Sequence, residues 1–203
     1  LQRIITGFVG SDIAIVAMLL AVTILGLTRY EHGDPQSMLS FALHFSGIMY
    51  LGWLGAYAIS LTNIQPNGRW WFISTIVLVW LVDLGAYTVG SLSGRHKMTP
   101  RLSPKKSWEG FAGGILFGTG FGALLAIVLQ PWFPELQILE GALLGLAIAL
   151  VTPFGDVFVS MIKRVAGVKD SGTLIPGHGG VLDRIDTWMW AGMVGFYMAQ
   201  LFK

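Results

Sequence analysis

Six apolar stretches, each close to the length that crosses a lipid bilayer, dominate this chain of 203 residues. A membrane-spanning helix needs about 20 mostly apolar residues. Only 12% of the residues are charged and the mean hydropathy is +0.66, whereas about 25% charged residues is usual in a soluble domain. A chain with so little polar surface requires lipid around much of it. The predicted spans are Ile13–Thr28, Met38–Leu61, Trp70–Gly90, Trp108–Leu129, Leu136–Val159 and Ile185–Phe202.

These stretches predict an all-α fold: a polytopic membrane helix bundle of about six transmembrane helices, at least one of them broken. The break is expected at Pro153, because proline removes a backbone hydrogen bond inside a helix. Glycines recur within the spans, as in GGILFGTGFG, which suits close packing between membrane helices. Residues 1–69 are expected to form N-terminal transmembrane helices, and residues 70–203 a second part that carries most of the polar residues.

Two polar connections hold most of the basic residues. One runs from Arg95 to Lys106 and the other from Lys163 to Arg184. Two spans separate these connections, so both should lie on the same side of the membrane. An excess of Lys and Arg marks the cytoplasmic side, and the two connections therefore predict a polar cytoplasmic face.

The stretch GHGGVLDRID, residues 177–186, concentrates polar residues directly before the last span. Asp183 and Asp186 are spaced i, i+3 at the start of a helix, so they can face one point, although acids in a first helical turn are also ordinary partners of the helix dipole. Glycine-rich turns can present backbone N–H groups to an anion. Together these features predict a metal–phosphate site, which would also include Gly177, His178, Gly179, Gly180 and Arg184.

A third candidate carboxylate lies inside the fifth stretch. Asp156, Ser160 and Lys163 are spaced i, i+4, i+7, which places them on one face of a helix. A carboxylate in a membrane span is costly unless it is paired or bound to a cation, and such residues are functional by default. The alternative is an Asp156–Lys163 ion pair that only joins helices.

The stretch LSPKKSWEG supplies basic residues for the same face. Ser103 followed by Pro104 predicts a helix start, with a cap and then proline in the first turn. Lys105 and Lys106 would then lie where the helix dipole disfavours cations, which indicates that a ligand supplies negative charge. The alternative is contact with lipid headgroups, and the same two interpretations apply to Arg95 and Lys97.

The remaining ionisable residues have weaker patterns. Asp83, in VDLGAY, is predicted either to contact substrate or to hold Tyr87, one turn further along. His96 is expected at the surface, and His32 and His44 are expected to be structural.

Taken together, the predicted face offers carboxylates for a divalent metal and cations for phosphates. Mg²⁺ typically takes one or two carboxylates plus substrate phosphates. Transfer of phosphoryl and nucleotidyl groups depends mainly on positioning and on charge stabilisation. Because the chain has no cysteine, thiolate chemistry is excluded, and transfer of a phosphate-containing group is favoured.

Several motifs resemble the phosphatidate cytidylyltransferase (CDP-diacylglycerol synthase) family. They cover roughly the last two-thirds of the chain in the family's order, and the longest is the most specific. One position departs, since many bacterial members have an acid where Val159 lies. The chain also has fewer spans before Trp70 than the family usually has, so residues 1–69 are expected to be truncated or divergent. The matching stretches are DLGAY at 83–87, SPKKSWEGFAGG at 103–114, GD at 155–156 and SMIKRVAGVKDSGTLIPGHGGVLDRID at 160–186.

The resemblance implies a Mg²⁺-dependent enzyme that converts CTP and phosphatidate into CDP-diacylglycerol and pyrophosphate, with one or two divalent ions and room for a second cation. It would lie in a bacterial inner membrane with the active site facing the cytoplasm. The lipid bilayer is an expected partner, a homodimer is one expected assembly, and no nucleic acid is expected. Another CTP-dependent enzyme acting on a different lipid, a transporter and an inactive scaffold remain as alternatives.

The roles expected on this basis divide the candidate residues into three groups. The carboxylates that hold metal are Asp156, Asp183 and Asp186, and Lys163 joins them as a catalytic residue. The residues that neutralise phosphates are Lys105, Lys106, Lys163, Arg164, Lys169 and Arg184. The other substrate-binding residues are Asp83, Ser103, Ser160, Asp170, Gly177, His178, Gly179 and Gly180.

Overall fold

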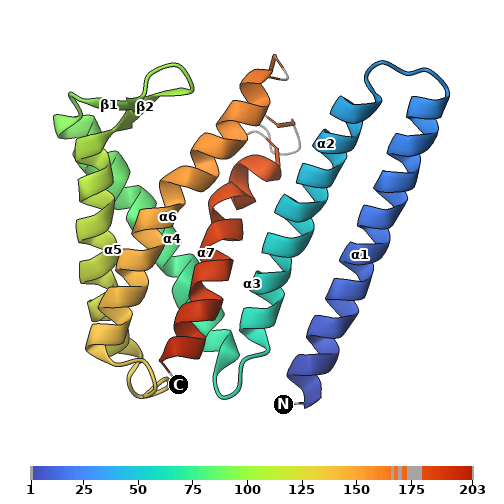
Figure 1. Ribbon diagram of the computed structural model, residues 1–203. Helices are drawn as coiled ribbons and strands as arrows, with labels where there is room; N and C mark the ends of the chain where they lie inside the picture. Colours follow the sequence, from blue (N-terminus) through green and yellow to red (C-terminus); the bar gives the residue numbers. More distant parts are fainter. Residues whose placement is uncertain (1, 166, 169–170, 173–179, 203) are drawn as a thin grey trace.

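The structure, a computed structural model, describes residues 2–165, 167–168, 171–172 and 180–202, and the side chains from residue 15 onward. Long helices run side by side along one common direction (Figure 1). The all-α membrane bundle is therefore confirmed, with one small hairpin added. The elements are α1 (Gln2–Glu31), α2 (Ser37–Gly47), η1 (Ile48–Leu54), α3 (Gly55–Thr62), α4 (Gly68–Ser93), β1 (Lys97–Thr99), β2 (Ser103–Ser107), α5 (Trp108–Leu129), α6 (Ile138–Val165) and α7 (Leu182–Leu201).

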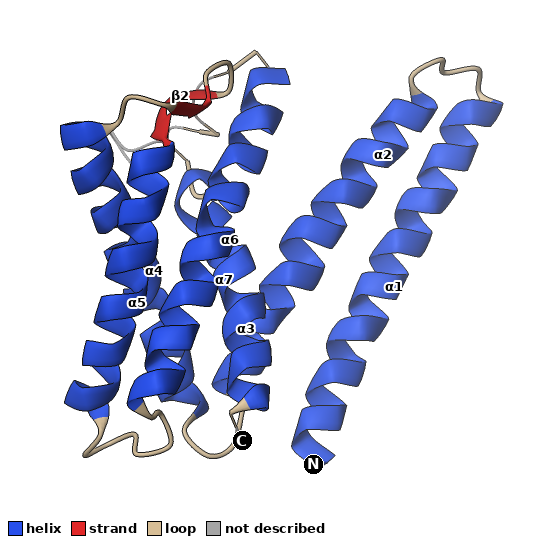
Figure 2. Cartoon of the chain, turned by 60° about the vertical axis from the view of Figure 1, so that its left-hand side comes forward, coloured by secondary structure: helices blue, strands red, loops and turns tan. Residues whose placement is uncertain are grey.

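Within the described residues, four helical segments are long and apolar enough to cross a membrane: 37–62, 68–93, 108–129 and 138–165. The first is a continuous rod formed by α2, the π-helix η1 and α3. The other two predicted spans correspond to α1 and α7, which run alongside these four (Figure 1). Figure 2 shows α1 and α2 as a pair to one side of the bundle that contains α4 to α7.

Glycines allow α4, α5 and α6 to pack with their backbones close together. A Cβ added to Gly118 of α5 would lie 2.6 Å from the carbonyl oxygen of Gly145 on α6. A Cβ added to Gly110 would lie 2.8 Å from the carbonyl oxygen of Ala86 on α4. Larger residues would push these helices apart, so packing accounts for these glycines. The core that results contains Leu61, Leu78, Leu144, Ile148 and Ala191.

The predicted break at Pro153 is wrong, because α6 continues through this residue from Ile138 to Val165. The Oγ1 of the preceding Thr152 donates to the carbonyl of Ile148 at 2.8 Å. Contacts with α5 on one side and α7 on the other hold the helix in place. Tertiary packing therefore outweighs the single hydrogen bond that proline removes.

The predicted helix start at Ser103 is also wrong. Residues 103–107 form β2, which pairs antiparallel with β1, with Lys97 opposite Ser107. The helix cap is Ser107 instead, whose Oγ accepts a hydrogen bond of 3.1 Å from the backbone N–H of Gly110 in α5. Consequently Lys105 and Lys106 lie on a strand above the helix ends.

Candidate functional site

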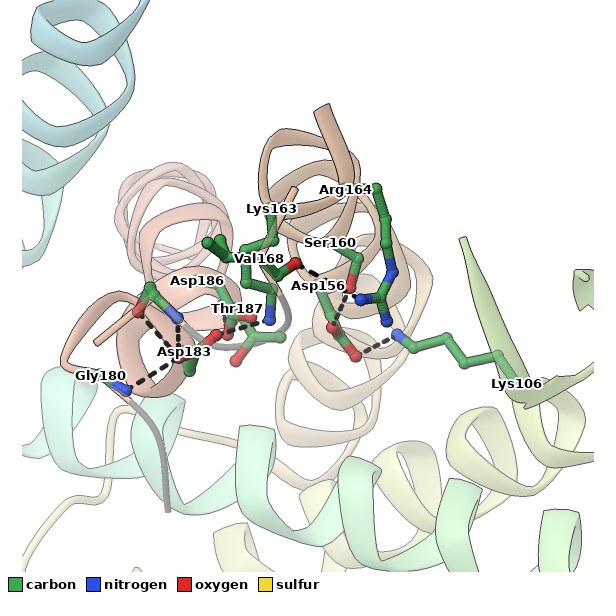
Figure 3. A network of polar contacts seen from close by, with 11 residues as sticks. Lys106, Asp156, Ser160, Lys163, Arg164, Val168, Gly180, Asp183, Asp186 and Thr187 are labelled. Atoms are coloured by element: carbon green, nitrogen blue, oxygen red, sulfur yellow. Dashed lines mark hydrogen bonds and ion pairs between the residues drawn. The ribbon is translucent and has the colours of Figure 1, made fainter. Parts of the chain in front are cut away.

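Polar side chains gather at the hairpin end of the bundle, where β2, α6 and α7 meet. Figure 3 shows Lys106 reaching from β2 toward Asp156 on α6, with Lys163, Asp183 and Asp186 beside them. Neither terminus lies at this end of the bundle (Figure 1). The most polar part of the chain thus lies at one end of the helices.

A pocket of about 340 Å³ opens beneath the hairpin, between α4, α5 and α6. Apolar side chains form most of its wall. Asp83 experiences attraction from Lys106 and repulsion from Asp156. In the described part of the chain no hydrogen bond joins Asp83 to Tyr87. Of the two predicted roles, the structure therefore favours a position at the pocket, where Asp83 can contact substrate, over a role in holding Tyr87. The chemically important lining residues are Asp83, Ser103, Lys105, Lys106, Ser107 and Asp156.

Lys106 neutralises the intramembrane carboxylate Asp156. Its Nζ lies 2.7 Å from Oδ2 of Asp156, and Ser160 donates to Oδ1 at 3.4 Å. The Asp156 side chain remains 38% exposed, so a ligand can reach it. The alternative of an Asp156–Lys163 pair is wrong, because Lys163 pairs with a different aspartate.

That aspartate is Asp183, in the first turn of α7. Lys163 Nζ lies 2.5 Å from its Oδ1, and the two side chains are only 15% and 11% exposed. Its Oδ2 accepts three further hydrogen bonds, from the N–H and the hydroxyl of Ser171, each at 2.8 Å, and from the N–H of Gly180 at 2.9 Å. Hydrogen bonds of this kind favour the ionised carboxylate. Asp183 therefore joins α6, α7 and the connection between them.

Asp186, the third carboxylate, is buried at the contact between α7 and Gly155 of α6. Its Oδ1 accepts a hydrogen bond of 2.7 Å from the N–H of Thr187, and it experiences repulsion from Asp156 and attraction from Lys106 and Lys163. A Cβ added to Gly155 would lie 2.6 Å from the Asp186 carbonyl. The glycine before Asp156 thus lets α6 approach the backbone of α7 closely at Asp186.

The donor set fits a hard divalent cation together with phosphates. Asp156 and Asp183 each hold a lysine ammonium group in this structure, and Asp186 adds a buried carboxylate near both lysines. Among the described residues, no three His, Asp or Glu side chains lie close enough together to hold one ion, so the structure does not bring the predicted set of Asp156, Asp183 and Asp186 together around a single metal. Water molecules, and substrate oxygens once the substrate is bound, would complete such a site, as is common for Mg²⁺.

The other predicted site residues are only partly brought into this cluster. Arg164 donates to the carbonyl of Val168 at 3.4 Å, and Arg184 lies exposed beside Asp183. Exposed His96 pairs with Glu109, as a surface residue would, and His32 and His44 bond backbone carbonyls one turn back. Five predicted residues lie outside the described ranges: Lys169, Asp170, Gly177, His178 and Gly179.

Sequence reasoning missed two parts of this site. Ser171 donates two hydrogen bonds to Asp183. The one sequence signal for this role is that Ser171 directly follows the predicted site residues Lys169 and Asp170. Tyr50 lies within residues 1–69 and donates a hydrogen bond of 2.9 Å to the Asp186 carbonyl. No local sequence pattern marks Tyr50 as a residue of the site.

Comparison with known proteins gives consistent matches along the chain. The model of the cytidylyltransferase family matches residues 3–202. The phosphatidate cytidylyltransferase of Mycobacterium bovis is 45% identical over 166 residues, which cover 79% of this chain and 52% of that protein. That of Bacillus subtilis is 33% identical over 193 residues, covering 95% of this chain and 69% of that protein. That of Staphylococcus aureus is 34% identical over 181 residues, covering 88% and 64%.

The chain spans about half the length of the mycobacterial relatives that it matches. The family model nevertheless covers nearly all of it, including every element of the site described above. On this evidence the chain belongs to the cytidylyltransferase family.

Proposed function

We propose that this protein transfers a cytidylyl group from CTP to the phosphate of phosphatidate, which yields CDP-diacylglycerol and pyrophosphate. The observation that carries the proposal is the cluster of Lys106, Asp156, Lys163 and Asp183 at the end of a membrane bundle. It combines carboxylates for a cation with cations for phosphates, beside a largely apolar pocket. The relatives carry the name of this activity.

The reaction requires little proton transfer. The phosphate monoester of phosphatidate is largely ionised near neutral pH, since the second pKa of such esters is about 6. One of its oxygens attacks the α-phosphorus of CTP, a new P–O bond forms, and the bond from the α-phosphorus to the bridging oxygen breaks. Pyrophosphate leaves with that bonding pair, so the step needs no dedicated general base.

The protein's main task is then to hold two anions together. Lys106 and Lys163 bring positive charge to the place where the phosphates of CTP and phosphatidate meet. Further positive charge around this place comes from Lys105, Arg164 and Arg184. Fixed charges that face the developing transition state are usually the largest contribution to such catalysis. A Mg²⁺ held by Asp156 and Asp186 would supply charge stabilisation and orientation of the phosphate oxygens.

The proposal includes the protein's position in the cell. The basic hairpin would face the cytoplasm of a bacterial inner membrane, so that CTP arrives from water and phosphatidate arrives laterally. Because the chain lacks cysteine, Arg101→Cys in the hairpin and Glu135→Cys at the opposite end provide single labelling sites. A maleimide that cannot cross membranes should label Glu135→Cys in intact cells and Arg101→Cys only after lysis. The reverse pattern would contradict this orientation.

A homodimer is the proposed assembly, and crosslinking in native membranes tests it.

The activity test uses purified protein and α-labelled CTP with a panel of lipids: phosphatidate, an isoprenoid-ether phosphate, a polyprenol and no lipid. The proposal expects labelled lipid and pyrophosphate in equal amounts with phosphatidate. Product with a different lipid alone would overturn the proposed substrate. Ion flux without any use of CTP would overturn the enzyme assignment.

A further inference from the structure

Tyr50 connects η1 to the site from a distant part of the chain. Its hydroxyl donates a hydrogen bond of 2.9 Å to the backbone carbonyl of Asp186, 136 residues away. The ring is buried and packs against Phe158 of α6, with 4.9 Å between the ring centroids. Tyr50 therefore contacts both helices that carry the carboxylates.

The local backbone at Tyr50 is unusual. Ile48–Leu54 forms a π-helix inside an otherwise α-helical rod. Such segments are rare in proteins, and those that occur are often found at functional sites. The two buried residues of η1, Tyr50 and Leu54, form a small cluster with Val159 of α6. The π-helix is thus placed against the junction of α6 and α7.

The Asp186 carbonyl is held from two sides. Tyr50 donates to it, and Gly155 of α6 packs so closely that an added Cβ would lie 2.6 Å from it. The residue after Gly155 is Asp156, whose carboxylate repels that of Asp186. These contacts therefore set how closely the backbone at Asp186 packs against the turn of α6 that carries Asp156.

We infer that Tyr50 is a positioning residue for Asp186, an inference that rests on the proposed function of the site. Its hydroxyl holds the N-terminal part of α7 against α6 so that Asp156 and Asp186 act together on one divalent cation and its phosphate ligands. Tyr50 does so through the backbone of Asp186, and the ring alone cannot supply this constraint.

The test compares Tyr50→Phe with Tyr57→Phe in the full chain. Tyr57, on α3, is also buried, and its hydroxyl bonds the Tyr197 hydroxyl of α7 at 2.9 Å. Tyr197 lies 11 positions beyond Asp186, about three helical turns away. Both variants keep the ring and lose a hydroxyl that contacts α7, but only Tyr50→Phe changes the contact at Asp186.

The readout is Mn²⁺ binding without substrate, followed by electron paramagnetic resonance, together with the Mg²⁺ dependence of the initial rate. Loss of a group that orients a metal ligand typically weakens metal affinity about tenfold or more. Tyr50→Phe should therefore weaken Mn²⁺ binding about tenfold and raise the Mg²⁺ concentration for half-maximal rate similarly. The KM for phosphatidate should stay unchanged, and Tyr57→Phe should bind Mn²⁺ like the parent protein.

Equal Mn²⁺ affinity in the parent and in Tyr50→Phe would overturn the inference, as would an equal loss in Tyr57→Phe. Absence of saturable Mn²⁺ binding to the parent protein would overturn both this inference and the proposed cation. Absence of CTP turnover in the parent would contradict the proposed function alone, because the comparison of Mn²⁺ affinities does not require turnover.

Discussion

Lys106 on the β-hairpin and Asp156 on α6 form an ion pair, with 2.7 Å between Nζ and Oδ2. This pair joins an element outside the helices to a carboxylate within a membrane span. It also places the ammonium group of Lys106 at the pocket that Asp83 lines. The hairpin therefore completes the site as well as covering it.

Lys106→Met should lower kcat/KM for CTP about 100- to 1000-fold, because it removes fixed positive charge from the place where the two anions meet. Arg101→Met is the matched control, since Arg101 is an exposed cation between the two strands. Steady-state kinetics of both variants test this. Equal activity of the two variants would remove Lys106 from the mechanism.

Gly155→Ala should push α6 away from α7, because its Cβ would lie 2.6 Å from the Asp186 carbonyl. We expect a loss of stability of about 1–3 kcal/mol and a fall in turnover of about 100-fold from misplaced carboxylates. Gly120→Ala is the control, because a Cβ there meets no atom within 4 Å. Thermal unfolding and initial rates of both variants provide the measurement, and normal turnover in Gly155→Ala would show that the close approach is unnecessary.

Asp183→Asn should abolish turnover and leave the protein folded and extractable. The asparagine side chain replaces a charged acceptor with a neutral amide, so the Lys163 ammonium loses its counter-ion in a site where the two side chains are 15% and 11% exposed. Breaking a buried pair in this way costs on the order of 3–5 kcal/mol. Circular dichroism and the turnover assay together test the expectation. A folded variant with near-normal activity would exclude Asp183 from catalysis.

Ser107→Ala should lower the free energy of unfolding by about 1 kcal/mol, the usual contribution of an N-cap hydroxyl. Its Oγ accepts the hydrogen bond from the Gly110 N–H at the start of α5. Ser91→Ala is a suitable control, since its exposed hydroxyl bonds a carbonyl within α4. In thermal unfolding, a midpoint lower by a few degrees is expected for Ser107→Ala only. Equal unfolding midpoints for Ser107→Ala and Ser91→Ala would show that packing, and not the Ser107 hydroxyl, stabilises the start of α5.

The sequence predicted the parts of this structure that depend on local patterns. The span predicted at Trp108–Leu129 coincides with α5, because an apolar run of membrane-spanning length is flanked by polar residues on both sides. The hairpin was not predicted, since β2 depends on pairing with Lys97–Thr99, and its Ser-Pro pair imitates a helix start.

The observed ion pairs Lys106–Asp156 and Lys163–Asp183 could not be predicted from the sequence for a similar reason. Helical spacing places Asp156 and Lys163 on one face, but it cannot say which neighbouring element a long lysine side chain reaches. Lys163 extends to Asp183, and Lys106 supplies the partner of Asp156. The close approach at Gly155 and the contact from Tyr50 likewise depend on how the helices pack.

The most direct test of the account compares the parent protein with Asp156→Asn and Asp34→Asn in the conversion of CTP and phosphatidate, with EDTA and then with added Mg²⁺. Asp34 pairs with Arg29 and lies between α1 and α2, outside the site. We predict that EDTA stops the parent and Asp34→Asn, that Mg²⁺ restores both, and that Asp156→Asn is inactive at every Mg²⁺ concentration. Near-parental turnover by Asp156→Asn would contradict the claim that carboxylates of α6 and α7 hold the cation on which transfer depends.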